Sequence, residues 1–194
     1  MPEALLETYA DELVVSRTLP AIERWLDYLD RHRGAWRPHG GFGDWLAPEP
    51  TPTPLVVEAY LAIAARVGSE LALQLGECKR MQKFARIARK AQTNFRKKWI
   101  TEAGVPRPPT QTACVLALRT GALDDEATAR TRAALIADVR ARKHHLTTGF
   151  LGTPWLLEEL VGAGAVEDAL EVLLQRDYPG WLYPIIRGGA TSMW

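Results

Sequence analysis

The amino-acid sequence predicts an all-α protein assembled from about four helical hairpins, and three observations lead to this fold class. Apolar residues recur at helical spacing along most of the 194-residue chain, with almost no strand-like alternation. Short connections join the helices within each pair, whereas long connections rich in Gly, Pro and aromatic residues separate the pairs. The composition, 47% hydrophobic and 24% charged with a net charge of +1, is that of a globular domain with a sizeable core.

The first helical pair is predicted near the start of the chain. Its first apolar stripe consists of Leu5, Leu6, Tyr9 and Leu13. A cap at Ser16 or Thr18 is expected to start the second helix, whose stripe consists of Leu19, Ile22, Trp25, Leu26 and Leu29.

The other three pairs follow the same pattern of apolar spacing. The second pair is predicted at 54–67 and 77–99. Pro54 suits the first turn of the first of these helices, because an N–H at that position would have no acceptor within the helix. The third pair is predicted at 110–119 and 125–142, and the fourth at 154–160 and 166–174. Together these stripes account for most of the chain.

Neither the cysteines nor the chain start indicates a metal, a cofactor or a membrane. Cys78 and Cys114 fall in helical segments without ligand or disulfide spacing, so both are expected to be small core residues. The first residues lack the basic and apolar regions of a signal peptide, and no apolar run approaches the roughly 18 residues of a membrane span. We therefore expect a cytoplasmic protein with no metal, no cofactor and no membrane partner.

The four long connections are expected to share one face. They cover residues 39–48, 104–112, 144–154 and 177–184. Alternate connections in a stack of hairpins lie at the same end, and polar and aromatic loops on a rigid scaffold commonly carry a binding site. A helical solenoid, with Trp and Gly merely closing each unit, is the alternative, although the variable hairpin lengths argue against a strict repeat.

Five motifs in these connections resemble, in the same order, those of bacterial α-L-rhamnosidases. They are Gly43-Asp-Trp-Leu, Gln111-Thr-Ala, His145-Leu-Thr-Thr-Gly-Phe-Leu-Gly-Thr-Pro-Trp-Leu-Leu, Tyr178-Pro-Gly-Trp-Leu-Tyr-Pro and Gly189-Ala-Thr-Ser-Met-Trp. The resemblance covers nearly the whole chain. It implies an (α/α)6 toroid, to which residues 1–194 supply a part of about four hairpins, in the catalytic domain of an inverting hydrolase that removes terminal α-L-rhamnose from glycosides.

The resemblance also implies that both catalytic carboxylates lie outside the chain. In the family a glutamate, the general base, follows the stretch matching 190–194, and the general acid lies in an Asp-Glu-Arg-x-Gly-Trp-like motif upstream of the helix matching 5–13. Inversion needs both groups, roughly 6.5–9.5 Å apart, so no catalytic residue is expected here and the chain alone is expected to be inactive. The open flanks of an incomplete ring predict self-association or a loosely packed chain.

Five loop residues are candidates for binding the sugar: Asp44, Trp45, His145, Trp181 and Trp194. Indole rings pack against the C–H faces of sugars, and carboxylate and imidazole groups hydrogen-bond hydroxyls. Each has a structural alternative: a turn for Asp44, a loop tether for His145 and core cover for the tryptophans. Trp25, Trp99 and Trp155 fall on helical stripes or at helix ends and are assigned to packing.

A different class of function is suggested by a basic segment. Residues 79–98 carry nine Lys and Arg residues and no acidic residue, interleaved with apolar positions. Such a helix can bind nucleic acid, an anionic membrane or a calmodulin-like protein, but the near-balanced net charge favours a solvated outer helix and no nucleic-acid partner. The remaining alternative is a non-catalytic α-hairpin module that binds a sugar or protein through the loop face.

Overall fold

The computed structural model describes residues 2–32 and 42–192, which are helical except for turns, loops and one isolated bridge between Ile100 and Pro106. The helices in these ranges are α1 (Pro2–Tyr9), α2 (Glu12–His32), α3 (Thr53–Gln74), α4 (Cys78–Trp99), α5 (Gln111–Thr120), α6 (Asp125–Ala141), α7 (Thr153–Gly162), α8 (Val166–Leu173) and α9 (Tyr183–Gly188). The all-α prediction is confirmed.

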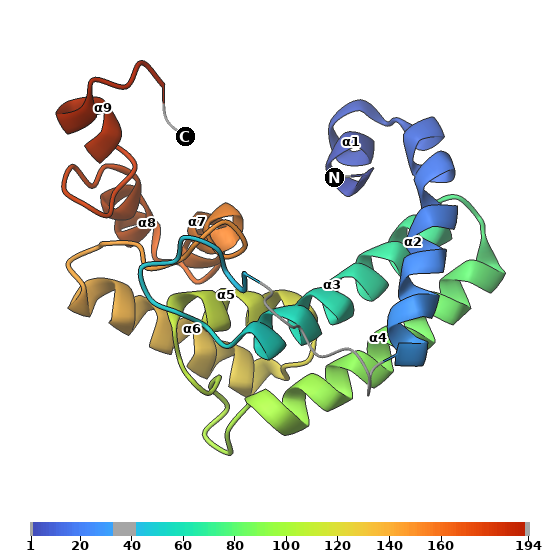
Figure 1. The fold of residues 1–194 in the computed structure, drawn as a ribbon. Coiled ribbons are helices and arrows are strands. Elements are labelled where there is room, and N and C mark those ends of the chain that lie inside the picture. Colours follow the sequence, from blue (N-terminus) through green and yellow to red (C-terminus); the bar gives the residue numbers. More distant parts are fainter. Residues whose placement is uncertain (1, 33–41, 193–194) are drawn as a thin grey trace.

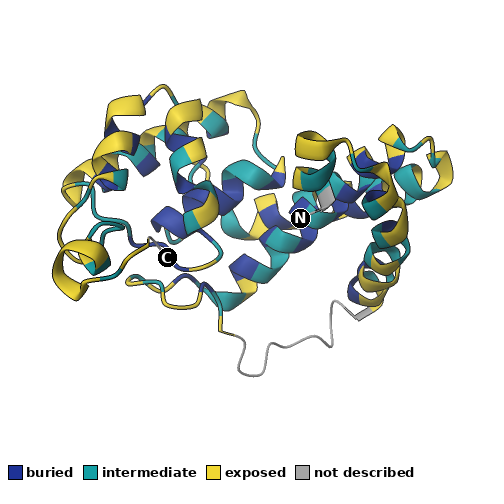
Figure 2. Ribbon diagram, turned by 90° about the horizontal axis from the view of Figure 1, so that it is seen from above, coloured by how far each residue is buried: buried dark blue, intermediate teal, exposed yellow. Residues whose placement is uncertain are grey.

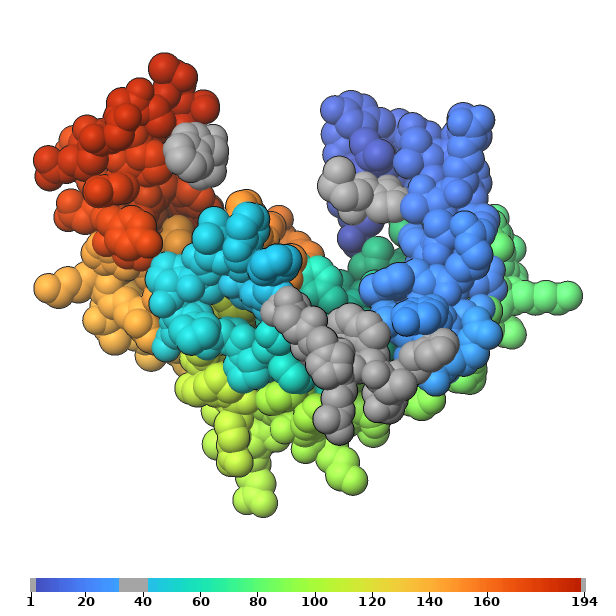
Figure 3. Space-filling model, in the orientation of Figure 1, coloured from blue at the N-terminus to red at the C-terminus, as the bar shows by residue number. Residues whose placement is uncertain are grey.

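Successive hairpins follow one another along an arc that is open on one side, with α1 and α9 at its two tips (Figure 1). Within the arc α5 contacts α3, α6 and α7, so it lies in the middle of the molecule. Burial is concentrated there and falls towards the outer turns (Figure 2). The space-filling view shows a wide notch between the C-terminal part and the N-terminal helices (Figure 3).

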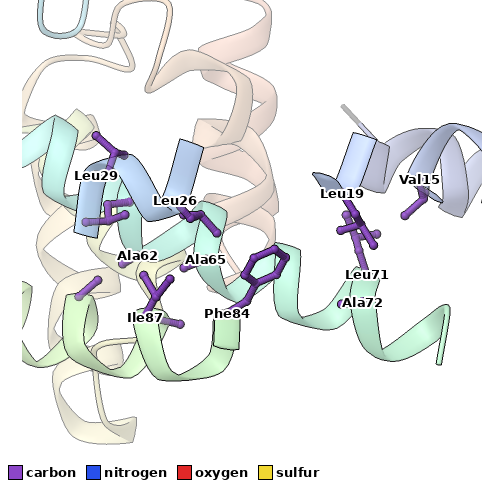
Figure 4. Packing of buried hydrophobic residues seen from close by; sticks show 13 residues of the cluster. Val15, Leu19, Leu26, Leu29, Ala62, Ala65, Leu71, Ala72, Phe84 and Ile87 are labelled. Carbon is purple, nitrogen blue, oxygen red and sulfur yellow. The ribbon is translucent and has the colours of Figure 1, made fainter. Parts of the chain in front are cut away.

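Three apolar clusters hold neighbouring hairpins together along the arc. The first joins α2, α3 and α4, with Leu26, Phe84 and Ile87 among its fully buried side chains (Figure 4). The second joins α3, α4 and α5 around Phe95 and Leu116, and the third joins α5 to α8. The core is therefore a chain of pairwise contacts between adjacent helices.

Two helix boundaries differ from the sequence-based prediction. The expected cap at Ser16 or Thr18 is wrong, because both hydroxyls donate to carbonyls inside α2, while Asp11 accepts a hydrogen bond from the backbone N–H of Val14. Helix α3 continues past Gly68, where a Cβ would lie only 3.1 Å from Cδ2 of Phe84. The glycine therefore marks a close helix–helix contact instead of a helix end.

The packing assignments are confirmed for Cys114, Trp99 and Trp155 but wrong for Cys78 and Trp25. Cys114 is buried as expected, but Cys78 is exposed because it begins α4 at the surface. Trp99 and Trp155 pack against the second cluster, whereas Trp25 is 45% exposed on the outer face of α2 and was wrongly assigned to the core.

In the described ranges no helix has both the length and the apolar content needed to cross a bilayer.

The long connections meet on one face, although not over their whole length. The backbone N–H of Glu49, one residue past the first connection, donates to the carbonyl of Thr147 in the third. Gln175, two residues before the fourth connection, donates to the carbonyl of Lys143, one residue before the third. The second reaches the same face only at its end, where Thr110 hydrogen-bonds Thr51 at 2.6 Å. Its earlier part folds against α6 instead: Thr131 donates to the carbonyl of Gly104.

Candidate functional site

Asp44 joins the first and third connections through its carboxylate. Oδ1 accepts hydrogen bonds from the backbone N–H groups of Leu151 (2.6 Å) and Gly152 (3.3 Å). Oδ2 accepts from the N–H of Gly149 (2.7 Å) and from the hydroxyl of Thr112. With only 6% of the residue exposed, both carboxylate oxygens are committed to the protein itself. We call this arrangement the Asp44 clasp.

The clasp lies where two helices begin. Thr112 belongs to the first turn of α5, and Gly152 is the cap of α7, so the partial positive charge of both N-termini favours a carboxylate here. The hydroxyl of Tyr60 donates to the carbonyl of Leu151, and burial, with a smaller contribution from the charge of Asp44, raises the pKa of Tyr60 to about 12. The geometry favours the structural alternative for Asp44 that the sequence left open.

Trp45 stands beside the clasp with its ring half exposed. It is 52% exposed and stacks on Phe150 with ring centroids 5.3 Å apart. The ring of Phe42 is tilted against the same Trp45 ring, with the two centroids 5.8 Å apart. The backbone N–H of Phe150 donates to the carbonyl of Trp45, which fixes the two loops relative to each other. The result is an exposed aromatic surface on a rigid support, a surface suited to a sugar ring.

An open, mainly apolar groove of about 780 Å³ adjoins this surface. Leu46 and Phe150 form one part of its lining, and Tyr178, Trp181 and Tyr183 form another. Trp181 therefore lies in the groove while also packing against the third core cluster. Of the predicted residues, Asp44, Trp45 and His145 do not line this groove.

His145 is tied to its own loop. Its Nδ1 lies 2.8 Å from the carbonyl oxygen of Arg142, and its own carbonyl accepts a hydrogen bond from Gln111. These contacts match the loop tether that the sequence left open for His145. Trp194, the fifth candidate, lies outside the described residues.

Gln111 is a residue whose role sequence reasoning missed. Its side chain is fully buried, donates to Asp138 and to the carbonyl of His145, and accepts from the N–H of Thr147. One amide group thus connects α5, α6 and the third connection. A polar residue at the start of an otherwise apolar helix was the available signal, because a buried amide needs partners on every side.

Two further carboxylates bound to residues of the third connection or its neighbours, Glu49 and Asp138, are engaged by other groups of the protein. Glu49 pairs with Arg142 at 2.9 Å, and Asp138 is bound by Gln111 and Arg142. Asp44 is held as described above. The described residues also contain no cluster of three or more His, Cys, Asp or Glu side chains that could hold a metal ion. The face therefore offers aromatic and hydrogen-bonding surfaces around carboxylates that are already paired.

A second carboxylate anchors the start of the third connection. Asp168, whose side chain is 8% exposed, receives two hydrogen bonds from Arg140 and one contact from Nε2 of His144 at 2.9 Å. The hydrogen bond from Arg140 is the main reason that the pKa of Asp168 falls to about 2. His144 has a φ of 61°, a conformation that needs such support in a non-glycine residue.

Asp168→Asn is expected to lower the free energy of unfolding by about 1–2 kcal/mol at neutral pH, because it removes the charge that Arg140 binds. The loss is no larger because Arg140 is exposed and water screens its charge. The folded carboxyl has a pKa of about 2, below the ordinary 3.8, so its stabilisation is present above 3.8 and is lost as the pH falls towards 2. Urea unfolding at several pH values measures this. The exposed neighbour Glu167 provides the control, Glu167→Gln; equal effects of the two substitutions at neutral pH would contradict the prediction.

The basic helix α4 is largely neutralised by acidic side chains around it. Lys83 pairs with Glu23 and Asp27, at 2.9 and 2.7 Å, and Arg80 also pairs with Glu23. These hydrogen bonds lower the pKa of Glu23, with Lys83 as the largest cause. Further pairs bind Lys90 to Asp30 and Lys98 to Glu58. Basic side chains of α4 therefore form ion pairs with α2 and α3, which weakens the nucleic-acid alternative.

Comparisons with known proteins agree on one family. The model of the bacterial alpha-L-rhamnosidase 6 hairpin glycosidase domain matches residues 1–194. An alpha-L-rhamnosidase of Streptomyces avermitilis is 36% identical over 198 residues, which cover 100% of this chain and 19% of that protein. One from Alteromonas sp. is 30% identical over 100% of this chain and 22% of the relative.

Solved structures show the same fold. The crystal structure of Streptomyces avermitilis alpha-L-rhamnosidase complexed with L-rhamnose superposes with a TM-score of 0.86 and 36% identity, over 96% of this chain and 18% of that one. The alpha-L-rhamnosidase of Aspergillus terreus gives a TM-score of 0.89 at 24% identity, over 97% of this chain and 23% of that one. The expected fold, an incomplete (α/α)6 toroid, is confirmed.

Proposed function

The chain belongs to the bacterial alpha-L-rhamnosidase six-hairpin glycosidase domain family, and from this premise we propose that it forms part of the catalytic domain of an enzyme removing terminal α-L-rhamnose from glycosides. It spans about a fifth of the length of the curated relatives it matches, 19% and 22%. In this proposal the chain contributes a sugar-binding face, and other parts of a longer protein contribute the proton-transfer groups. The 194-residue chain alone is then inactive.

The observation that carries the proposal is the aromatic surface beside the clasp. Trp45, stacked on Phe150 and half exposed, offers an apolar ring face to the C–H groups of a pyranose. Trp181, from the adjoining groove, and Trp194 are proposed as further sugar contacts. His145 and Asp44 are proposed to support sugar binding indirectly, by holding their loops in position. Direct hydrogen bonds to sugar hydroxyls are the alternative for both residues.

The proposed reaction is hydrolysis with inversion. One carboxylic acid protonates the departing glycosidic oxygen while a carboxylate on the opposite face activates water, roughly 6.5–9.5 Å away. The pairing of Asp44, Glu49 and Asp138 with protein groups supports placing both proton-transfer groups elsewhere. This chain orients the sugar ring between them.

Hydrolysis of an aryl α-L-rhamnoside tests the proposal directly. A polypeptide extended in both directions, to include the acid motif and the glutamate expected after Trp194, should be active and should release the inverted sugar first. The 194-residue chain should be at least about 10⁴-fold slower, since each proton-transfer group contributes about 10²–10⁴. Comparable activity of the two polypeptides, or a retained configuration, would contradict the proposal.

Trp45→Ala in the extended polypeptide should reduce kcat/KM by about 10–100-fold, equivalent to about 1.4–2.7 kcal/mol of lost ring contact. Tyr9→Ala removes a more exposed aromatic ring from α1 and serves as the matched control with unchanged activity. An unchanged kcat/KM for Trp45→Ala would remove Trp45 from the sugar-binding face.

A non-catalytic sugar-binding module remains the second candidate, because the exposed aromatic surface is built from this chain alone. It predicts that the isolated chain binds rhamnose, as measured by calorimetry, and that the extended polypeptide shows no turnover. An active extended polypeptide excludes it.

A further inference from the structure

Both polar backbone groups of Leu151, in the third connection, are bound by side chains from other parts of the chain. Its N–H donates to Oδ1 of Asp44 at 2.6 Å, and its carbonyl accepts from the hydroxyl of Tyr60 at 3.1 Å. The side chains of Leu151 and Tyr60 also pack against the second apolar cluster. The first connection therefore holds this residue through the Asp44 clasp, and α3 holds it from the core.

Tyr60 is itself fixed by contacts with two other helices. Its ring centroid lies 5.6 Å from that of Trp155, in the first turn of α7. The guanidinium of Arg119, from α5, lies 5.4 Å from the centroid of the same Trp155 ring and pairs with Glu159 at 2.7 Å. Because these contacts join α3, α5 and α7, the hydroxyl of Tyr60 meets the third connection from a fixed position.

The residue that Tyr60 holds adjoins the exposed aromatic surface. Phe150, directly before Leu151, stacks on Trp45 with ring centroids 5.3 Å apart and donates its N–H to the carbonyl of Trp45 at 3.0 Å. A shift of the Leu151 backbone would therefore move both rings. We propose that Tyr60 is a positioning residue for the sugar-binding face, a role that rests on the proposed function. Its hydroxyl fixes the Leu151 backbone and thereby the orientation of the stacked ring pair.

The orientation of the ring pair should matter more for the rate than for the affinity. A slightly displaced aromatic ring still packs against a sugar, but the sugar then no longer lies in line with the proton-transfer groups that other parts of a longer protein supply. A misplacement of about 1 Å can slow the chemical step by about 10²-fold. Loss of the Tyr60 hydroxyl should therefore lower kcat and leave KM nearly unchanged.

Tyr60→Phe in the extended polypeptide tests this role, because it keeps the ring contact with Trp155 and removes only the hydroxyl. For an aryl α-L-rhamnoside we expect kcat to fall about tenfold, while KM changes less than about twofold. Thr131→Val is the matched control, since the Thr131 hydroxyl also donates to a loop carbonyl, that of Gly104 at 3.0 Å, but in the second connection. Both variants should lower Tm by about 2–4 °C, and only Tyr60→Phe should lower kcat.

Hydrogen exchange in the same extended polypeptide gives a readout that does not depend on turnover. Tyr60→Phe should accelerate exchange of the backbone N–H groups of Phe150 and Leu151 about fivefold, because the segment that carries them loses one of its anchors. The N–H of Arg107, which donates to the carbonyl of Trp99 in the second connection, should exchange at its wild-type rate.

Four results would overturn the positioning role. An active wild type with an unchanged kcat in Tyr60→Phe would do so, as would unchanged exchange at Phe150 and Leu151. A raised KM with a constant kcat would make the hydroxyl a direct sugar contact. Equal losses of kcat in Tyr60→Phe and Thr131→Val would trace the effect to stability. In contrast, an inactive wild-type polypeptide would overturn the proposed function itself, and the role of Tyr60 with it.

Discussion

Gly149→Ala is expected to lower the free energy of unfolding by about 3 kcal/mol or more, at the upper end of the cost of overpacking a buried site. A Cβ at this position would lie 2.2 Å from the carbonyl oxygen of Trp45 and 2.7 Å from the backbone nitrogen of Ala47. Both are backbone atoms, so no side-chain rotation relieves the overlap and the first and third connections must separate.

Thermal unfolding measures this effect as a fall of about 6–12 °C in Tm for a chain of this size. Gly188→Ala is the matched control, because a Cβ there meets no atom within 4 Å and the backbone does not require glycine. Similar Tm values for the two variants would show that the two connections do not lie in contact as described.

Asp44→Ala is expected to cost about 3–5 kcal/mol of stability, because it leaves three backbone N–H groups and one hydroxyl without their acceptor. Asp44→Asn should be intermediate: one oxygen remains, but an NH2 group then faces the N–H of Gly149. Asp177→Ala, at an exposed position in the fourth connection, should have almost no effect on urea unfolding.

A double-mutant cycle with Thr112→Val separates the two roles proposed for Asp44. A coupling energy of about 0.5–3 kcal/mol in the absence of sugar identifies the clasp as structural. Unchanged stability of Asp44→Ala, together with lost rhamnose affinity, would instead make Asp44 a substrate contact and would contradict the clasp.

The helical hairpins were predictable because their apolar stripes are long and regular, and α4 differs from its predicted range by one residue. Short or interrupted elements were not. The predicted range 54–67 stops just before Gly68, whereas α3 continues to Gln74, because the sequence does not show that Phe84 packs on this glycine. Helix α9 was missed because its six residues include Pro184 and Gly188, which locally favour a turn.

The meeting of the long connections on one face was predictable, but the contacts within that face were not. Loop composition indicated the face, and motif order indicated the family. The partners of Asp44 lie up to 108 residues away, so only the folded chain distinguishes a clasp from a sugar ligand. The same holds for Gln111, whose three partners come from two other segments.

The long sequence separation within the Asp44 clasp has a consequence for the order of folding. Each hairpin joins helices that are neighbours in the chain, so its loop-closure entropy is small and its helices form early. The bonds from Gly149 and Leu151 to Asp44 close loops of 105 and 107 residues and can form only after the intervening hairpins are in place. We therefore expect the face formed by the first and third connections to be the last part of the molecule to form and the first to open, so that the proposed sugar binding is lost before the helices unfold.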